Sequence, residues 1–276
     1  MTRRRFRFDG GQTFIHTVLV LLATFTFVPL LTLLALSLKD TYQFINQPIG
    51  LSFPFEWKNY EMAWAFMRDP LAHNIIVATA AVSANLFMAS LSAYVFARFD
   101  FPFRNVLFSL VGILLFVPGT VLLVPNYVLI VNLKVQNTLM ALILPYAAQQ
   151  VFTLVVLRTF FEELPQEMFD AAKVDGASVF QEYLNIAIPL SGPIISAMAI
   201  FQVWQIWNDY AWPSLVANSN EARTAVTGLI YFNDFSRPEP GAGMAAAVIA
   251  AVPMLILFLV TMRSFIAGLT AGAVKG

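Results

Sequence analysis

The sequence predicts an all-α integral membrane protein with six transmembrane helices. Of its 276 residues, 59% are hydrophobic and 12% are charged, whereas soluble domains average about 45–50% apolar and roughly 25% charged residues. Six uncharged runs are each longer than the roughly 18–20 residues that cross about 30 Å of hydrocarbon as a helix. Because lipid cannot pair open backbone groups and the apolar residues do not alternate with period 2, helices are predicted rather than a β-barrel.

The composition also excludes several classes of function. The formal net charge is zero, which gives no basis for a nucleic-acid partner. The chain has no cysteine and only two histidines, His16 and His73, far apart in the sequence. It therefore offers neither a thiolate nor a histidine cluster to a metal ion, and we predict no metal site and no cofactor bound by this chain.

The first run, at about 12–38, follows a basic segment with four arginines between residues 3 and 7. This pattern resembles a secretory signal peptide, but the apolar stretch is longer than the roughly 7–15 residues of a signal-peptide core. We therefore predict an N-terminal segment at 1–12 and an uncleaved first span at 13–38.

Five further runs lie at about 70–97, 105–133, 135–157, 183–208 and 240–262. Only Lys134 separates the third run from the fourth, so the turn between these spans is predicted beside it. The resulting division has an outer loop at 39–70, a core membrane domain at 71–262 and a C-terminal tail at 263–276.

Lysine and arginine positions predict the orientation. Arg98, Arg104, Arg158 and Arg263 lie directly at span ends, where the excess of cations on the cytoplasmic side has most force. With six spans both termini lie on one side of the membrane, and these arginines place the termini in the cytoplasm. The loop at 159–189 is then cytoplasmic too.

This loop is predicted to fold as helix, turn and helix. Pro165 suits the first turn of a helix. Gly176 permits the positive φ of a sharp turn, and Ser178 is a suitable N-cap for the second helix. A loop this regular, between two spans, indicates an ordered element with a function of its own.

Two interpretations of the loop remain open, namely an amphipathic helix that rests on lipid headgroups and a helix that docks into a protein socket. Phe169, Ala172 and Val174 form only an incomplete apolar stripe, and the loop is net acidic, which does not suit an anionic membrane surface. Small residues such as Ala171 and Gly176 permit close approach, so the socket is favoured.

The segment DAAKVDGASVFQEYLNIAIP, at 170–189, resembles the EAA motif of ABC importer permeases. That motif reads E-A-A, three residues, Gly, nine residues and I-x-L-P. The triplet D-A-A at 170–172 fills its start, and Gly176 follows at the expected spacing. Asp170 replaces the usual Glu and Ile188 replaces the usual Leu, which are conservative changes in charge and volume.

Two further stretches carry the resemblance. WNDYAWPSLV, at 207–216, is similar to the W-N-[ED]-x-x-W-P segment of carbohydrate-type permeases, and RSFIAGLTAGAVKG, at 263–276, is similar to the ending of MalG-like sugar permeases. With PFEWKNYEMAW near 54–64, the resemblance covers nearly the whole chain. It implies the type I ABC importer permease fold, with a cytoplasmic coupling-helix loop.

The resemblance also implies a function and partners. It implies a permease subunit of an ATP-driven carbohydrate importer in a bacterial-type inner membrane, surrounded by lipid. The partners would be a second homologous permease, an ABC ATPase dimer, an extracytoplasmic solute-binding protein and the carbohydrate substrate. The residues implied to contact the ATPase are Asp170, Ala171, Ala172, Asp175, Gly176, Ala177 and Phe180 in the loop, with Thr270, Lys275 and Gly276 in the tail.

The chain itself lacks the chemistry of an energy source. It has no G-x-x-x-x-G-K-[ST] phosphate loop, so ATP and Mg²⁺ are expected in the partner ATPase and this chain is not expected to be an enzyme. The spans hold no series of acids for a proton relay. An ion-coupled secondary transporter of a small polar solute remains the alternative, because backbone carbonyls can bind sodium without such acids.

An aromatic and polar cluster near the outer end of the fifth run supplies the candidates for the substrate path. Helical spacing places Trp204, Trp207 and Asn208 on one face. Amides bond sugar hydroxyls, and indole faces suit sugar C–H surfaces. The competing interpretation is an interfacial aromatic belt. The candidates are Trp204, Trp207, Asn208, Asp209 and Trp212.

Other polar residues lie within the apolar runs. Asn74, Asn85 and Gln202 are predicted to make hydrogen bonds between helices. For Gln149 and Gln150, with Tyr146, in the fourth run, a structural role and a place on the pathway both remain open.

Overall fold

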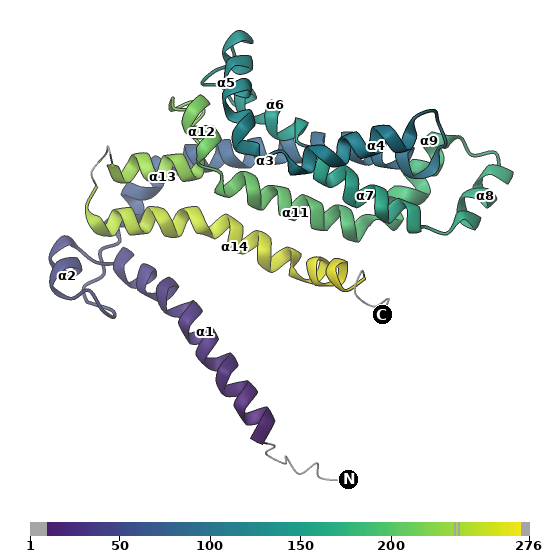
Figure 1. The fold of residues 1–276 in the computed structure, drawn as a ribbon. Coiled ribbons are helices and arrows are strands. Elements are labelled where there is room, and N and C mark those ends of the chain that lie inside the picture. Colours follow the sequence, from purple (N-terminus) through teal and green to yellow (C-terminus); the bar gives the residue numbers. More distant parts are fainter. Residues whose placement is uncertain (1–9, 235, 237, 272–276) are drawn as a thin grey trace. The chain divides into compact units, whose positions relative to one another are not determined.

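The computed structural model describes residues 10–234, 236 and 238–271, with side chains described through Met262. These residues form helices and no strand, which confirms the all-α prediction. Three helices are long and apolar enough to cross a membrane alone, and three bent helix pairs bring the candidate spans to six, as predicted. The three continuous helices are α1 (Gly10–Ser37), α3 (Lys58–Arg98) and α14 (Pro240–Ala271) (Figure 1).

The three remaining spans are broken. The bends are 93° between α4 (Arg104–Ile113) and α5 (Leu123–Asn132), 40° between α6 (Met140–Ala148) and α7 (Val151–Glu163), and 74° before α11 (Gly192–Asn208). Pro118 explains the first bend, because the residue before a proline is driven out of the helical region and Val117 is extended. Pro193 lies in the first turn of α11, where its missing N–H leaves no helical bond unmade.

The described parts of residues 1–66 and 231–251 form one compact unit. Threonine hydroxyls along α1 donate to the carbonyls four residues earlier, so these hydroxyls do not face lipid unpaired. Asn59 Nδ2 donates to the carbonyls of Ser37 and Lys39 at 3.0 and 2.9 Å. This amide fastens the end of α1 to the start of α3.

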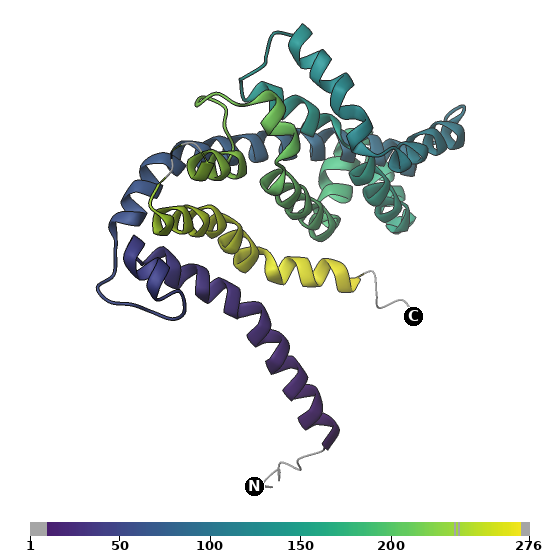
Figure 2. The same ribbon diagram turned by 60° about the vertical axis from the view of Figure 1, so that its left-hand side comes forward.

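Residues 67–230 and the described part of 252–276 form the second compact unit, which holds both predicted sites. Its core includes two clusters of buried side chains, one around Trp212 and the other around Phe169. α3 contributes residues to both clusters. From Met67 onward this helix extends along the whole unit (Figure 2).

Two boundaries differ from the predicted division of the chain. The predicted outer loop at 39–70 contains a short helix, α2 (Thr41–Asn46), and is helical again from Lys58 onward, where α3 begins. The predicted tail at 263–276 continues α14 as far as Ala271. Hydropathy marks only the stretch that crosses hydrocarbon, and a helix can run on into water with polar residues such as Glu61.

Close packing at Gly228, in α13 (Ala225–Asp234), generates the first prediction. A Cβ added there would lie 2.8 Å from Pro70 Cβ and 2.9 Å from Pro70 Cγ. Gly228→Ala is expected to lower the free energy of unfolding by about 1–3 kcal/mol through overpacking. Thermal unfolding of the purified protein in detergent measures this change.

The matched control is Gly112→Ala in α4, since nothing lies within 4 Å of a Cβ added there. Replacing this helical glycine is expected to stabilise the protein by about 0.5–1 kcal/mol. Equal stability of the two variants would contradict the packing of α13 against Pro70.

Candidate functional site

The two predicted sites lie at opposite ends of the second unit. α8 (Gln166–Val174) and α9 (Val179–Glu182) lie at one end, while α5 and α12 (Ala211–Val216) lie at the other (Figure 1). We call residues 164–182 the coupling element and the hollow bordered by α5, α6 and α11 the cavity.

Local sequence explains how the coupling element folds. Pro165 directly precedes α8, which has an acid in its first turn and a base in its last, as the helix dipole favours. After α8, Gly176 has a φ of +80°, so the predicted positive-φ turn is confirmed. Ser178 then caps α9 and forms a capping box with Gln181, which satisfies two backbone donors reciprocally.

Two contacts hold α8 against the membrane helices. Phe169 is 1% exposed and joins the buried cluster of Tyr94 and Phe161. The Arg98 guanidinium lies 4.0 Å from the centroid of the Phe169 ring, and its Nη2 donates to the carbonyl of Leu164 at 2.8 Å. Because α8 has only nine residues, which is too short for a stable isolated helix, these contacts determine where it lies.

The other faces of the coupling element are open. Val174 was predicted to share an apolar stripe with Phe169, but it is 88% exposed, so that prediction is wrong. Five residues at 3.6 per turn place the two side chains about 140° apart around the helix axis. Of the residues predicted to contact a partner, Ala172 and Ala177 are half-buried, and those exposed are Asp170, Ala171, Asp175, Gly176 and Phe180.

Beyond α9 the chain returns to the apolar region through an irregular helix. Glu182 is 4% exposed and accepts a hydrogen bond from the Tyr94 hydroxyl at 3.3 Å, while Tyr183 and Ser90 share one at 2.7 Å. A single π-helical turn, η3 (Tyr183–Ala187), follows. The burial of Glu182 could not be predicted from the sequence, because an isolated acid gives no sign of the distant tyrosine that pairs with it.

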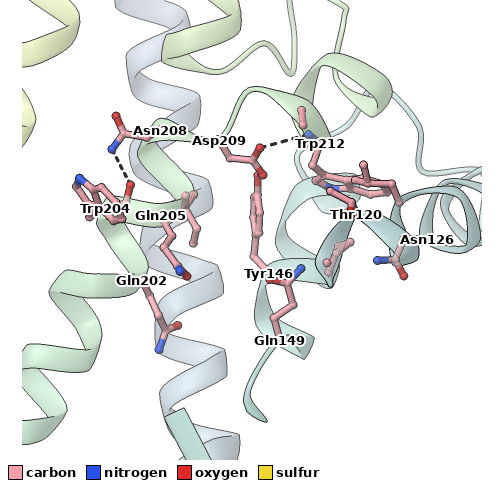
Figure 3. A pocket seen from close by; sticks show the side chains of 15 residues that line it. Thr120, Asn126, Tyr146, Gln149, Gln202, Trp204, Gln205, Asn208, Asp209 and Trp212 are labelled. Carbon is pink, nitrogen blue, oxygen red and sulfur yellow. Dashed lines mark hydrogen bonds between the residues drawn. The ribbon is translucent and has the colours of Figure 1, made fainter. Parts of the chain in front are cut away.

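A cavity of about 460 Å³ lies at the other end of the unit. α11 forms one wall, and α6 with the segment leading into α5 forms the opposite wall (Figure 3). Among the described residues that line the cavity, Asp209 is the only one with a formal charge, and none is a lysine, arginine or histidine. The polar and aromatic lining residues are Thr120, Asn126, Tyr146, Gln149, Gln202, Trp204, Gln205, Asn208, Asp209 and Trp212.

The structure brings together four of the five residues predicted for the substrate path. Trp204, Asn208, Asp209 and Trp212 line the cavity. Trp207 does not line it and is 6% exposed. Of the face defined by spacing at 204, 207 and 208, only Trp204 and Asn208 therefore border the cavity.

Three hydrogen bonds fix the start of α12 beside the cavity. The Tyr146 hydroxyl donates to Asp209 Oδ2 at 2.8 Å, and the Trp212 backbone N–H donates to Asp209 Oδ1 at 3.3 Å. The indole Nε1 of Trp212 donates to the carbonyl of Ala141 at 3.1 Å. Tyr146 and Trp212 thus have structural roles as well as a place on the cavity wall.

Gln205, Thr120 and Asn126 are polar cavity residues that sequence reasoning missed. Gln202, Gln205 and Asn208 recur every three residues and all border the cavity, so amide spacing was the available signal. Gln202 donates to Thr153 Oγ1 at 2.9 Å, and Asn208 donates to the carbonyl of Trp204 at 2.8 Å (Figure 3). The Gln205 amide is exposed and has no hydrogen bond to another described residue.

The polar residues predicted to join helices divide into two groups. Gln202 bonds α7 through Thr153, and Asn85 bonds the carbonyls of Tyr146 and Ala147, so both predictions are confirmed. Asn74 is fully buried, but neither of its amide atoms has a hydrogen-bond partner among the described residues. Its predicted hydrogen bond is therefore not found there.

Three residues of the tail, Thr270, Lys275 and Gly276, were also predicted to contact the ATPase. Thr270 lies in the last turn of α14, in the part of the helix where only the backbone is described. Lys275 and Gly276 lie outside the described residues.

Comparison with known proteins identifies the family. Residues 85–270 match the family of binding-protein-dependent transport system inner membrane components, and the chain belongs to that family. It is therefore a multi-pass permease subunit of the inner membrane and not itself an enzyme. The ion-coupled alternative finds no support among its relatives.

Curated relatives match along nearly their full lengths. The arabinooligosaccharides transport system permease protein AraQ of Halalkalibacterium halodurans is 32% identical over 90% of this chain and 91% of its own length. The probable ABC transporter permease protein YurM of Bacillus subtilis is 30% identical over 96% and 89%. The trehalose/maltose transport system permease protein MalG of Thermococcus litoralis is 29% identical over 93% and 94%.

A solved structure shares the fold. A chain in the crystal structure of a bacterial ABC transporter involved in the import of the acidic polysaccharide alginate matches with a TM-score of 0.81. The match covers 96% of this chain and 100% of that chain at 17% identity. The predicted importer permease fold is thereby confirmed.

The burial of Phe169 generates the second prediction. Phe169→Ala is expected to lower stability by about 3–5 kcal/mol, as for other large-to-small core changes, and to release α8 from the helices behind it. Val174→Ala, on the exposed side of the same helix, is expected to change stability by less than about 0.5 kcal/mol. Hydrogen exchange across 166–174 measures both, and equal protection in the two variants would contradict the anchoring role of Phe169.

Proposed function

We propose that this chain is one of two permease subunits of an ATP-driven carbohydrate importer. The observation that carries the proposal is the coupling element, which is anchored from behind by Phe169 and Arg98 and exposes Asp170, Ala171 and Gly176. Family membership supports it. The partners are a second permease, an ATPase dimer that holds ATP and Mg²⁺, and an extracytoplasmic solute-binding protein.

The orientation in this proposal has both termini and the coupling element in the cytoplasm. Arg98, Arg104 and Arg158 support it, because they gather at the end of the unit that carries α8. Arg104 pairs with Asp100 at 2.8 Å and with Glu162 at 3.2 Å. Cations concentrated at one end of a helix bundle indicate its cytoplasmic side.

In the proposed mechanism, the ATPase dimer closes on ATP and carries α8 with it. The exposed side of the coupling element fits the ATPase, while the anchored side passes the displacement to the membrane helices. The permease pair then turns from inward-facing to outward-facing, the binding protein releases its carbohydrate, and hydrolysis resets the complex. The ATPase carries out ATP hydrolysis, and the helices of this chain move to open and close the substrate path.

The lining of the cavity favours an uncharged carbohydrate. Amides such as Gln205 and Gln149 suit hydroxyl groups, and the Trp204 ring suits a sugar's C–H face. The lining residues include no lysine or arginine to pair a phosphate or carboxylate, and Asp209 opposes an anion. Relatives are named for arabinooligosaccharides, trehalose/maltose and sn-glycerol-3-phosphate, and the cavity supports the neutral substrates among these.

Co-purification and uptake test this function together. The chain is purified in mild detergent with an N-terminal tag, and the chains that accompany it are identified by mass spectrometry. The recovered complex, with the solute-binding protein encoded beside it, is reconstituted in vesicles and given Mg·ATP with maltose, an arabinooligosaccharide or sn-glycerol-3-phosphate. We expect an ATPase, a second permease and ATP-dependent uptake of a neutral sugar. Purification of the chain alone, even after crosslinking, would refute the importer proposal.

The glycine turn of the coupling element generates the third prediction. Gly176→Asp places a side chain at φ +80° with nothing within 4 Å of the added Cβ, so its effect comes from the backbone and from the docking surface. Backbone strain of about 1–2 kcal/mol is expected, with roughly tenfold less uptake per ATP hydrolysed.

Gly50→Asp is the matched control, because Gly50 has φ +77° and equally open surroundings but lies outside the coupling element. Measurement of uptake and ATP hydrolysis in vesicles compares the two variants. If Gly176→Asp transports as well as Gly50→Asp, residues 164–182 do not couple to the ATPase.

The unengaged amide of Gln205 generates the fourth prediction. Gln205→Leu keeps a similar volume but removes the hydrogen-bonding groups, and about a fivefold loss of neutral-sugar uptake is expected from one missing bond. Gln136→Leu is the control, since that amide bonds the Tyr127 hydroxyl at 3.2 Å and lies outside the cavity. Uptake that falls equally in both variants would remove Gln205 from the substrate path.

A further inference from the structure

α3 contacts both candidate sites and is unbroken between them. Its last residue, Arg98, contacts the coupling element, and Asn85, nearer its middle, contacts the wall of the cavity. At 1.5 Å per residue these two positions lie about 20 Å apart along the helix axis. α7 meets α6 at a bend of 40°. α11 is continuous from Gly192 to Asn208, but a bend of 74° separates it from the segment that leaves the coupling element.

Arg98, the last residue of α3, contacts three separate groups of the coupling element. Nη2 donates to the carbonyl of Leu164 at 2.8 Å, and Nη1 donates to Gln166 Oε1 at 2.9 Å. The guanidinium also covers the Phe169 ring. Gln166 in turn donates to Asp170 Oδ1 at 3.0 Å. Arg98 is thus joined, through one intermediate side chain, to the first residue of the motif that faces the proposed ATPase.

Asn85 on α3 binds the backbone at the break between α6 and α7, beside the cavity. Asn85 Nδ2 donates to the carbonyls of Tyr146 and Ala147, both at 3.2 Å. α6 ends at Ala148, so carbonyls near this end lack the helical donors that would otherwise pair them. Tyr146 and Gln149 both line the cavity. A displacement of Asn85 along the axis of α3 would therefore reach the cavity wall directly.

Between these ends α3 is tightly held. Ala89, Ala93 and Tyr94 are buried in the cluster that includes Phe169, and Ser90 bonds the Tyr183 hydroxyl. Small side chains allow neighbouring helices to approach closely, and close-packed interiors transmit displacement rather than absorb it. The helix is therefore built to move as one body over this stretch.

We propose that α3 carries the movement of α8 to the cavity, with Arg98 and Asn85 as the two positioning residues of this linkage. The inference rests on the proposed function. Neither side chain lines the cavity, and of the two partners of Asn85, Tyr146 borders it. Their role is to make the distance across the cavity depend on the position of the coupling element.

The test measures that distance without requiring a known substrate. The natural chain has no cysteine, so Gln149→Cys with Ala211→Cys gives a single pair of spin labels across the cavity. The labelled chain is assembled with its ATPase and second permease in vesicles, and pulsed electron paramagnetic resonance records the distance with and without Mg·ATP. We expect Mg·ATP to shift the distance in this background.

Asn85→Leu and Arg98→Gln are then introduced separately and together. Each is expected to reduce the fraction of molecules that shift by about fivefold, the factor for loss of one buried hydrogen bond, while ATP hydrolysis continues. The double variant is expected to match the more severe single variant, because both interrupt one linkage. If Asn85→Leu fails to assemble, Asn85→Ala serves in its place.

The chain offers matched controls for both positions. Asn74 lies on the same helix and is equally buried but has no described hydrogen-bond partner, so Asn74→Leu should retain the shift. Arg158 covers the Phe108 ring at 3.9 Å but does not contact the coupling element, so Arg158→Gln should also retain it. Equal shifts in variants and controls would overturn the α3 linkage, whereas no shift in the background would overturn the proposed ATP coupling itself.

Discussion

Every peptide group inside a bilayer needs a hydrogen-bond partner within the protein, because hydrocarbon supplies none. This constraint favours helices in the apolar runs. Where a helix is interrupted, nearby side chains must pair the backbone groups that the interruption leaves open. At the break between α6 and α7, Asn85 supplies a donor from α3. The same amide links α3 to the cavity wall, so a movement of α3 would also displace that wall.

The coupling element meets the opposite constraint, since it lies where water is available but has too little length to hold a helix by itself. α8 is stabilised by the burial of Phe169 and by the Arg98 guanidinium. One side of a nine-residue helix is thereby committed to the membrane helices, and the other side is left to a partner. An element that transmits movement needs contacts on both sides, because a helix bound to the partner alone would move without displacing the membrane helices.

A few hydrogen bonds fix the polar groups that shape the cavity. Tyr146 and the Trp212 backbone hold Asp209 in place, and Gln202 is held by Thr153. These bonds satisfy the groups that position the walls, whereas the exposed Gln205 amide has no partner among the described residues. The specificity of the proposed path for uncharged sugars follows from this arrangement and from the lack of a cation among the lining residues.

The sequence by itself determined where the spans lie, that the 159–189 loop folds as helix, turn and helix, and that Gly176 turns with positive φ. These features depend on local chemistry, namely run length, capping residues and glycine. Only the tertiary structure decided that Glu182 is buried, that Val174 is exposed and that Trp207 lies off the cavity while Gln205 lies on it. A span is apolar on every face, so periodicity indicates which residues share a face but not which face meets a neighbour. That choice is made by packing between helices distant in sequence.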